Sequence, residues 1–167
     1  MSAAPLVHQA ALRVGETLRA QGLLLATAES CTGGMVSAAL TDIAGSSGWF
    51  ERGFVTYANQ AKTDMLGVPP ALLERHGAVS EPVARAMAEG ALRHSCAQVS
   101  LAITGIAGPD GGAPDKPVGT VWFAWSDARH THAERIIFQG NRAQVREQAA
   151  AHALRGVLNF VELGGRL

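Results

Sequence analysis

The sequence has little that would take the protein out of the cytoplasm or onto a charged partner. No run of about 18 apolar residues occurs, which excludes a membrane-spanning helix by length, and residues 1–22 lack the apolar core of a signal peptide. The 14 Lys and Arg residues balance 14 Asp and Glu residues, so no overall field favours nucleic acid or an anionic membrane. The two cysteines, Cys31 and Cys96, are too few for a disulfide framework. We therefore expect reduced thiols in the cytoplasm, with no membrane or nucleic-acid partner.

Metal-binding and triphosphate-binding motifs are also missing. The six histidines are scattered, and the closest pair, His130 and His132, has no third ligand beside it in the sequence. No Gly-Lys-Ser/Thr sequence occurs, so a P-loop has no support. We expect neither a metal nor another cofactor, and any anionic ligand must be held by local groups.

What is present predicts one α/β domain over residues 1–167. The length and the hydrophobic fraction of 47% are enough for a buried core. Short apolar runs alternate with helical segments, which is typical of a three-layer α/β/α domain with a mixed, mainly parallel sheet. We expect a hairpin of the last two strands and a long C-terminal helix, about 141–163, capped by Asn141. The predicted strands are 23–27, 53–57, 99–104, 118–126 and 133–138, and the other predicted helices are 5–21, 35–44, a short one capped by Asn59, and 81–94 capped by Ser80, with Pro69-Pro70 breaking the chain between the last two.

Two glycine-rich loops follow predicted strands. Ser30-Cys-Thr-Gly-Gly34 precedes a helix, whose N-terminus attracts a phosphate or carboxylate, although helix capping explains the segment equally well. The loop 104–112 has a similar capacity, and Arg142 in the first turn of the last helix offers a forked donor to an anion. Ligands of such sheets bind beyond the carboxyl ends of the strands. We expect the chemistry to lie there.

Lys62 is conspicuous because the chain has only two lysines against twelve arginines. Burial or a helix N-terminus lowers the pKa of a lysine from about 10.4 and makes it a usable base. Tyr57, the only tyrosine, ends a predicted strand five residues earlier, so both groups can face one cleft. Ser46 and Ser47 follow a helix, where unpaired backbone N–H groups stabilise an oxyanion, and a Ser–Lys pair attacks an amide without histidine. The alternatives are a solvated lysine, a core tyrosine and a capping serine.

A thiol nucleophile is the enzymatic rival of the serine. The helix that follows Cys31 would activate it, with His76, His94 or His152 as the base. No histidine lies in a recognisable pairing context, however, and a small buried cysteine is common in protein cores. The serine interpretation is therefore preferred.

Five segments in order along the chain resemble the CinA C-terminal family. The resemblance spans about residues 6–160, and the ordered set is far more specific than any single motif. The family includes stand-alone nicotinamide-nucleotide amidases, and the N-terminal pyrophosphatase-type domain of full CinA proteins is not expected in this chain. The five segments are Ala28-Glu-Ser-Cys-Thr-Gly-Gly34, Ile43-Ala-Gly-Ser-Ser47, Gly53-Phe-Val-Thr-Tyr-Ala-Asn59, Gly77-Ala-Val-Ser80 and Thr104-Gly-Ile-Ala-Gly-Pro-Asp-Gly-Gly112.

The resemblance implies hydrolysis of nicotinamide mononucleotide to nicotinate mononucleotide and ammonia, a step that recycles pyridine nucleotides toward NAD. It implies Ser47 as nucleophile, Lys62 as base and Tyr57 as supporting hydroxyl, with Ser46 one register position away. A homodimer is also implied, and a non-catalytic pyridine-nucleotide sensor is the alternative function. The implied substrate-binding residues are Ser30, Thr32, Gly33, Gly34, Ser46, Thr104, Gly105, Gly108 and Arg142.

Overall fold

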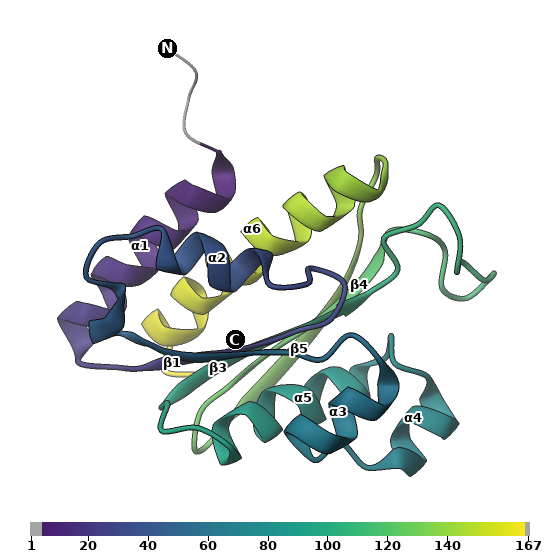
Figure 1. The fold of residues 1–167 in the computed structure, drawn as a ribbon, viewed down its shortest axis with the longest axis horizontal. Coiled ribbons are helices and arrows are strands. Elements are labelled where there is room, and N and C mark those ends of the chain that lie inside the picture. The colour runs from purple at the N-terminus through teal and green to yellow at the C-terminus, as the bar shows by residue number, and fades with distance from the viewer. Residues whose placement is uncertain (1–4, 166–167) are drawn as a thin grey trace.

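A five-stranded sheet lies between two layers of helices in the computed structural model, which describes residues 5–165 (Figure 1). The elements are α1 (Leu6–Gln21), β1 (Leu25–Glu29), α2 (Met35–Thr41), a 3-10 turn η1 (Ser46–Gly48), β2 (Phe50–Val55), α3 (Asn59–Leu66), α4 (Pro70–His76), α5 (Glu81–Arg93), β3 (Val99–Gly105), β4 (Thr120–Ser126), β5 (Thr131–Ile137) and α6 (Arg142–Glu162). Helices α1, α2 and α6 cover one face of the sheet, and α3, α4 and α5 lie on the other (Figure 1). The predicted three-layer α/β class is confirmed.

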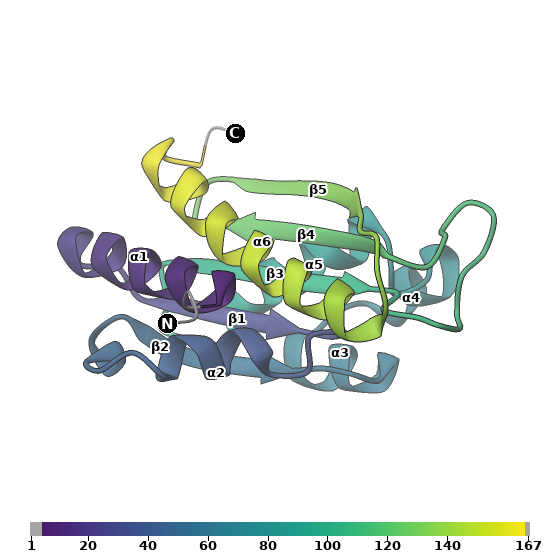
Figure 2. The ribbon, with the colours of Figure 1, turned by 90° about the horizontal axis from the view of Figure 1, so that it is seen from above.

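The sheet is mixed, as predicted, and its strand order is β2-β1-β3-β4-β5 (Figure 2). β1 pairs in parallel with both β2 and β3, whereas β4 is antiparallel to β3 and to β5. Four strands therefore run in one direction and β4 runs against them. The predicted hairpin of the last two strands is confirmed as β4 and β5.

The chain order places a topological switch at β1 and β3. The connection that leaves β1 leads through α2 to β2 on one side, and the connection that leaves its neighbour β3 leads to β4 on the other side (Figure 2). Where neighbouring strands send their connections to opposite sides, a crevice opens at the carboxyl edge of the sheet. The first and second glycine-rich loops begin at this edge, directly after β1 and at the end of β3.

The core is divided by the sheet into two clusters. Every residue of β1 is buried, and alternate residues belong to opposite sides: Leu25 packs with α1 and α6, whereas Ala26 and Ala28 pack with α5. A strand covered on both faces needs a continuous apolar run rather than alternation, which is the pattern that the sequence shows here. The helix layers on both sides of β1 therefore fix the position of Ser30, the residue that follows this strand.

Four local predictions between β2 and the start of α5 were wrong. Ser80 occupies the N-cap position of α5, but its side chain makes no capping hydrogen bond, and its hydroxyl donates to the Gly77 carbonyl at 2.8 Å. The Pro69-Pro70 pair starts helix α4 rather than a plain break, because a proline in the first helical turn lacks only an N–H that would be unpaired there. β2 spans Phe50–Val55 and not the predicted 53–57, so Tyr57 lies two residues beyond the end of the strand. Asn59 is the first residue of α3 and does not cap it.

The predicted final helix is confirmed as α6. The side chain of Asn141 accepts a hydrogen bond from the Gln144 backbone N–H, and the Gln144 side chain binds back to the Asn141 backbone. This reciprocal capping box fixes the start of α6, and it therefore fixes the placement of Arg142 in the first turn. Among the helices of residues 5–165, none is long and apolar enough to span a membrane.

Candidate active site

A cavity of about 270 Å³ lies at the carboxyl ends of β1 and β3. Its position is the switch point of the sheet, and its size is close to the lower limit of small-molecule sites, roughly 300 Å³. The first residues of both glycine-rich loops and the first turn of α6 form part of its wall. The lining residues are Ser30, Cys31, Tyr57, Lys62, Ala78, Val79, Thr104, Gly105, Ile106, Ala107, Gly108, Asp110, Gly111 and Arg142.

Lys62 reaches Ser30 at the floor of this cavity. The Nζ atom lies 3.1 Å from Ser30 Oγ, and it donates further hydrogen bonds to the backbone carbonyls of Thr56 at 2.8 Å and Tyr57 at 3.1 Å. Lys62 is 1% exposed and Ser30 is 8% exposed. The interpretation of Lys62 as a solvated surface residue is therefore wrong.

The environment of Lys62 favours its neutral form. Burial lowers the pKa of Lys62 from 10.5 to about 8, because a desolvated ammonium loses hydration that the protein does not fully replace. No carboxylate binds the Nζ atom among its described partners, which are two carbonyls and one hydroxyl. A neutral amine has two N–H donors for the two carbonyls and one lone pair left for the serine hydroxyl.

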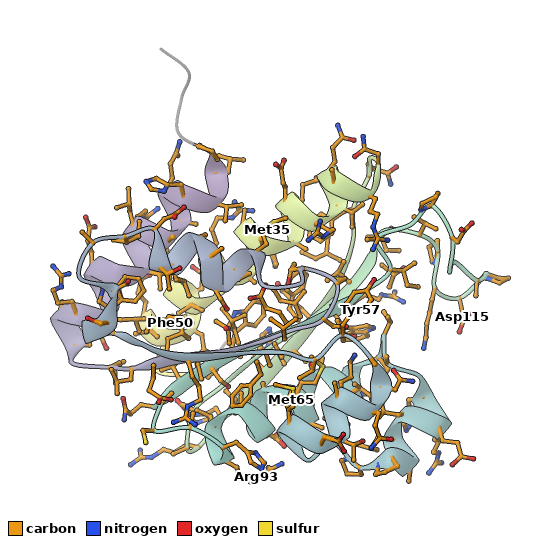
Figure 3. All side chains as sticks on the ribbon, viewed as in Figure 1. Met35, Phe50, Tyr57, Met65, Arg93 and Asp115 are labelled. Atoms are coloured by element: carbon orange, nitrogen blue, oxygen red, sulfur yellow. The ribbon has the colours of Figure 1, made fainter. Side chains whose placement is uncertain are left out.

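Ser47 and Ser46 lie at the opposite edge of the sheet from Lys62. Both belong to η1, which immediately precedes β2. Trp49 follows η1, and its carbonyl accepts a hydrogen bond from the Leu25 N–H, so η1 lies beside the start of β1. Six residues of β2 then run toward α3, a length on the order of 20 Å at about 3.3 Å per residue. Figure 3 shows Phe50 and Tyr57 at opposite ends of this segment. The structure does not bring Ser47 to Lys62; it brings Ser30.

Tyr57 lies at the mouth of the cavity, and its hydroxyl does not contact Lys62. The side chain is 62% exposed, and its Oη atom accepts a hydrogen bond of 3.1 Å from Arg142 Nη2. Arg142 Nη1 donates to the Gly108 carbonyl at 2.8 Å. One guanidinium thus joins the segment after β2, the second glycine-rich loop and the start of α6 around the opening.

The end of β3 forms another wall of the cavity. Thr104 Oγ1 donates to the Ala78 carbonyl at 2.9 Å, which ties β3 to the segment before α5. Gly105 allows a close approach, since a Cβ atom there would lie 3.1 Å from Cys31 Sγ and 2.7 Å from Val121. Thr104, Gly105 and Gly108 all line the cavity.

The expected anion site at the start of α2 is already filled by a carboxylate of the chain. Glu29 is fully buried, and its Oε1 accepts from the N–H groups of Gly34 at 3.2 Å and Val36 at 2.9 Å. Its Oε2 accepts from the N–H of Ser37 at 3.0 Å and from the Ser37 hydroxyl at 2.8 Å. The helix N-terminus stabilises this internal charge and repels a second anion. Of the two anions expected at this helix start, a phosphate or a carboxylate, the structure places a carboxylate of the chain itself there.

Three predicted residues of the first loop lie behind the cavity rather than on its wall. Thr32 is fully buried, and Gly33 and Gly34 adopt positive φ angles of 58° and 103°. These φ values favour glycine and let the chain turn from β1 into α2 within five residues. The two glycines shape the loop that carries Ser30, and neither lines the cavity.

Cys31 lines the cavity but is a poor nucleophile. Burial raises the pKa of its thiol to about 11, so it is protonated near neutral pH, and the thiolate is the reactive form. Two of the three proposed histidine bases bind elsewhere: the ring of His94 contacts the Gly90 carbonyl, and the ring of His152 contacts Glu134. The third, His76, is not among the residues that line the cavity. The geometry gives no support to the thiol alternative.

Sequence reasoning missed Glu29 and Arg146. Glu29 ends a strand that is buried throughout, and a carboxylate in such a position needs several donors, which was a usable signal. Arg146 follows Arg142 by one helical turn and donates from Nε to the Cys31 carbonyl at 3.0 Å and from Nη2 to the Thr32 carbonyl at 3.2 Å. Spacing on α6 places both arginines on one face, but only the fold shows which loop each one meets.

Residues 5–165 contain no group of three or more His, Cys, Asp or Glu side chains that could bind a metal ion together. His132 stacks on Trp125 with 6.1 Å between ring centroids, and His130 lies 3.6 Å from an Asp127 carboxylate oxygen. The two histidines that are close in sequence therefore have separate partners.

Several known proteins are similar to this chain in sequence and in fold. The CinA C-terminal domain model matches residues 7–161. The nicotinamide-nucleotide amidohydrolase PncC of Escherichia coli K12 is 57% identical over 144 residues, 86% of this chain and 87% of that protein. A competence-damage inducible protein of Symbiobacterium thermophilum is 55% identical over 89% of this chain, which spans only 37% of that longer protein. The crystal structure of the competence/damage inducible protein CihA from Agrobacterium tumefaciens matches with a TM-score of 0.92 and 42% identity, over 96% of this chain and 99% of that one.

Proposed function

The chain belongs to the CinA C-terminal domain family, and we propose that it hydrolyses nicotinamide mononucleotide to nicotinate mononucleotide and ammonia, with Ser30 as nucleophile and Lys62 as base. The reaction class follows from the likeness to relatives of similar length that carry the name nicotinamide-nucleotide amidohydrolase. The contact between Lys62 Nζ and Ser30 Oγ inside the cavity supports the choice of these two residues. Ser30 replaces Ser47, the nucleophile expected from the sequence.

The first half of the reaction forms an acyl-enzyme. Neutral Lys62 takes the proton of the Ser30 hydroxyl, and the oxygen attacks the carboxamide carbon. The resulting tetrahedral intermediate collapses when its nitrogen takes that proton back from Lys62 and leaves as ammonia. Ser30 then carries nicotinate mononucleotide as an ester, with the ribose phosphate still attached to the pyridine ring.

The second half repeats the proton transfers with water. Lys62 removes a proton from water, the hydroxide attacks the ester carbon, and the proton returns to Ser30 as the carboxylate is released. The carbonyls of Thr56 and Tyr57 hold the amine throughout, because each accepts one N–H in the neutral form. These two hydrogen bonds orient the neutral amine so that its lone pair faces the Ser30 hydroxyl.

A backbone N–H group beside Ser30 stabilises the oxyanion of both intermediates. The Cys31 N–H directly follows the nucleophile, belongs to a residue that lines the cavity, and has no backbone acceptor within residues 5–165. An N–H group fixed before the reaction does not need to reorganise as charge develops, which is the main source of its effect on rate.

The phosphate of the substrate binds at the mouth, on Arg142. The guanidinium lines the cavity and is partly open to solvent, so it can add a phosphate oxygen to its existing contacts with Gly108 and Tyr57. Asp110 lines the other part of the rim and disfavours an anion there. Binding energy from this remote group holds the carboxamide against Ser30.

The test is ammonia release from nicotinamide mononucleotide by the purified protein without added metal. We expect turnover, and we expect mass spectrometry of rapidly quenched samples to find nicotinate mononucleotide as an ester on the peptide that contains Ser30. Binding of the nucleotide without ammonia release would instead favour the sensor function. An adduct on another residue would overturn the choice of Ser30.

The cytoplasmic location and the homodimer remain parts of the proposal. They rest on the low cysteine content and on the family resemblance. Sedimentation equilibrium at micromolar concentration tests the dimer, and a monomer over the whole concentration range would contradict it. Cell fractionation tests the location.

A further inference from the structure

Asp110 is the only acidic side chain among the residues that line the cavity of the candidate active site. It belongs to the second glycine-rich loop, and it is exposed. Its carboxylate takes part in no hydrogen bond or ion pair within residues 5–165. The other charged groups on the cavity wall are two bases, Lys62 and Arg142. The carboxylate of Asp110 is therefore free to act on a ligand of opposite charge.

The loop that carries Asp110 is held in place before any ligand binds. Arg142 Nη1 donates to the carbonyl of Gly108, two residues before Asp110, at 2.8 Å. Farther along the loop, Lys116 Nζ donates to the His76 carbonyl at the end of α4, at 2.7 Å. In Figure 2 this connection between β3 and β4 projects beyond the end of the sheet. The two contacts tie it to α6 and to α4, so the fold sets the place of Asp110 on the cavity wall.

The substrate of the proposed reaction carries charges of both signs. Its phosphate is an anion, and the bond from ribose to the ring nitrogen gives the pyridine ring a fixed positive charge at every pH. With the carboxamide at Ser30 on the cavity floor and the phosphate on Arg142 at the mouth, the ring lies between them. A permanent cation must therefore be accommodated inside the cavity.

Asp110 is close enough to this cation to stabilise it. A compact cavity of 270 Å³ is roughly 8 Å across, which does not exceed the Debye length of about 8 Å at physiological ionic strength. The charge of Asp110 therefore acts on a ring anywhere in the cavity. The need for it grows during the reaction, because Lys62 becomes an ammonium when it takes the serine proton. The carboxylate of Glu29 does not line the cavity, and it is already bound by N–H groups of α2.

We propose that Asp110 is a specificity residue for the charge of the ring: its carboxylate stabilises the pyridinium cation, so the site takes the carboxamide of a cationic, N-ribosylated pyridine in preference to the amide of a neutral aromatic ring. This inference rests on the proposed function and narrows its substrate class. Arg142 and Asp110 divide the recognition of one nucleotide, since the base binds the phosphate and the acid binds the ring.

The experiment compares two ligands that differ in the charge of the ring. Nicotinamide mononucleotide has the cationic ring, and benzamide riboside 5′-monophosphate has a neutral benzene ring with the same carboxamide, ribose and phosphate. Isothermal titration calorimetry measures both dissociation constants in Ser30→Ala, which lacks the proposed nucleophile, with and without Asp110→Asn. We expect Asp110→Asn to weaken nicotinamide mononucleotide by ~5–50-fold, the order of one charge–charge contact at a partly exposed site, and the neutral analogue by less than about twofold.

Equal losses for both ligands would assign Asp110 to the ribose hydroxyls, which the two ligands share, and would overturn the proposal. Unchanged affinity for both would overturn it as well. Asp110→Glu keeps the charge and should retain most of the affinity for nicotinamide mononucleotide; a loss as large as that of Asp110→Asn would contradict recognition by charge.

Asp115→Asn is the matched control. Asp115 is an exposed acid on the part of the same loop that projects away from the sheet, and it does not line the cavity (Figure 3). We expect both affinities to stay within about twofold of the parent protein, because a fully solvated charge outside the cavity is screened. A loss as large as that of Asp110→Asn would mean that the total charge of the loop matters rather than the position of Asp110, and would reject the proposal.

Binding and turnover fail separately. Ammonia release by the wild type together with equal losses for the two ligands keeps the amidase and rejects the role of Asp110. A loss confined to the cationic ligand without ammonia release rejects the amidase and keeps the recognition of ring charge. If Ser30→Ala still releases ammonia, the choice of nucleophile fails, and kcat/KM for the nucleotide against the inhibition constant of the neutral analogue gives the same comparison.

Discussion

Two serine-containing turns of this protein look alike in sequence and differ completely in the fold. Ser30 and Ser47 each lie in a glycine-containing turn near a helix, and each is a plain capping residue when judged alone. Ser30 follows β1 at the carboxyl edge of the sheet, is 8% exposed and faces Lys62 at 3.1 Å. Ser47 precedes β2 at the amino edge and is exposed.

The comparison teaches that the edge of the sheet at which a serine lies determines whether it meets Lys62. In parallel strands, all carboxyl ends meet at one edge, so a residue after β1 and a residue after β2 are neighbours. Lys62 follows β2 in α3 and therefore meets the residue after β1. A residue before β2 is separated from Lys62 by the whole strand, although it is only fifteen positions away in the chain.

The largest expected effect distinguishes the two serines directly. Ser30→Ala should lower kcat for nicotinamide mononucleotide by ~10⁴-fold, as expected for loss of a nucleophile, whereas Ser47→Ala should stay within about twofold of the wild type. Ammonia release measured by a coupled assay tests both variants. Loss of activity in Ser47→Ala together with full activity in Ser30→Ala would contradict the choice of Ser30 as nucleophile.

The second prediction concerns the protonation of Lys62. Because only the neutral amine accepts the serine proton, kcat/KM should rise about tenfold per pH unit below an apparent pKa of about 8 and level off above it. A profile from pH 6 to pH 10 in buffers of constant ionic strength measures this. Activity that is flat from pH 6 to pH 9 would mean that Lys62 is not the base. Lys62→Met should lack both the activity and the rise.

The third prediction concerns the mouth of the cavity. Arg142→Ala should raise KM for nicotinamide mononucleotide by ~10–100-fold, which is the range for one charge-assisted contact, with a smaller change in kcat. Nicotinamide riboside, which has no phosphate, serves as the control substrate. Its kinetic constants should be nearly the same for the wild type and the variant, and an equal loss with the riboside would place the phosphate elsewhere.

The last prediction concerns stability rather than activity. The folded-state pKa of Lys62 lies below its usual 10.5, so between about pH 8 and pH 10.5 the unfolded chain binds more protons than the folded one. The free energy of unfolding should therefore gain up to ~3 kcal/mol from Lys62 as the pH rises through this window. Subtracting the pH dependence of Lys62→Met, measured by urea denaturation, isolates this contribution. A difference that falls with pH would contradict the direction of the shift.

The sequence allowed most of the fold to be predicted. Continuous apolar runs such as β1 and β3, and the capped final helix, carry local signals that tertiary contacts did not override. Helix α4 was missed because Pro69-Pro70 has the same local signal for a break and for a helix start. Tyr57 was placed in a strand, although it lies beyond β2, because strand ends have the weakest local signal.

The candidate site was only partly predictable. The resemblance and the scarcity of lysine pointed to Lys62, and the glycine-rich segments pointed to the loops that line the cavity. The direction of the Tyr57 hydroxyl toward Arg142 and the use of the α2 N-terminus by Glu29 had no local signal. Both depend on which side chains from distant segments are brought together.

The sequence by itself determined the α/β class and the family, and it singled out the lysine that we propose as the base, because periodicity, ordered motifs and composition are properties of the chain. Only the tertiary structure decided that Ser30, and not Ser47, lies beside that lysine. It also decided that Glu29 and Arg146 hold the loop between β1 and α2. The physical reason is that a hydrogen bond depends on a separation of about 3 Å in space, and the pairing of parallel strands sets that separation for residues more than thirty positions apart.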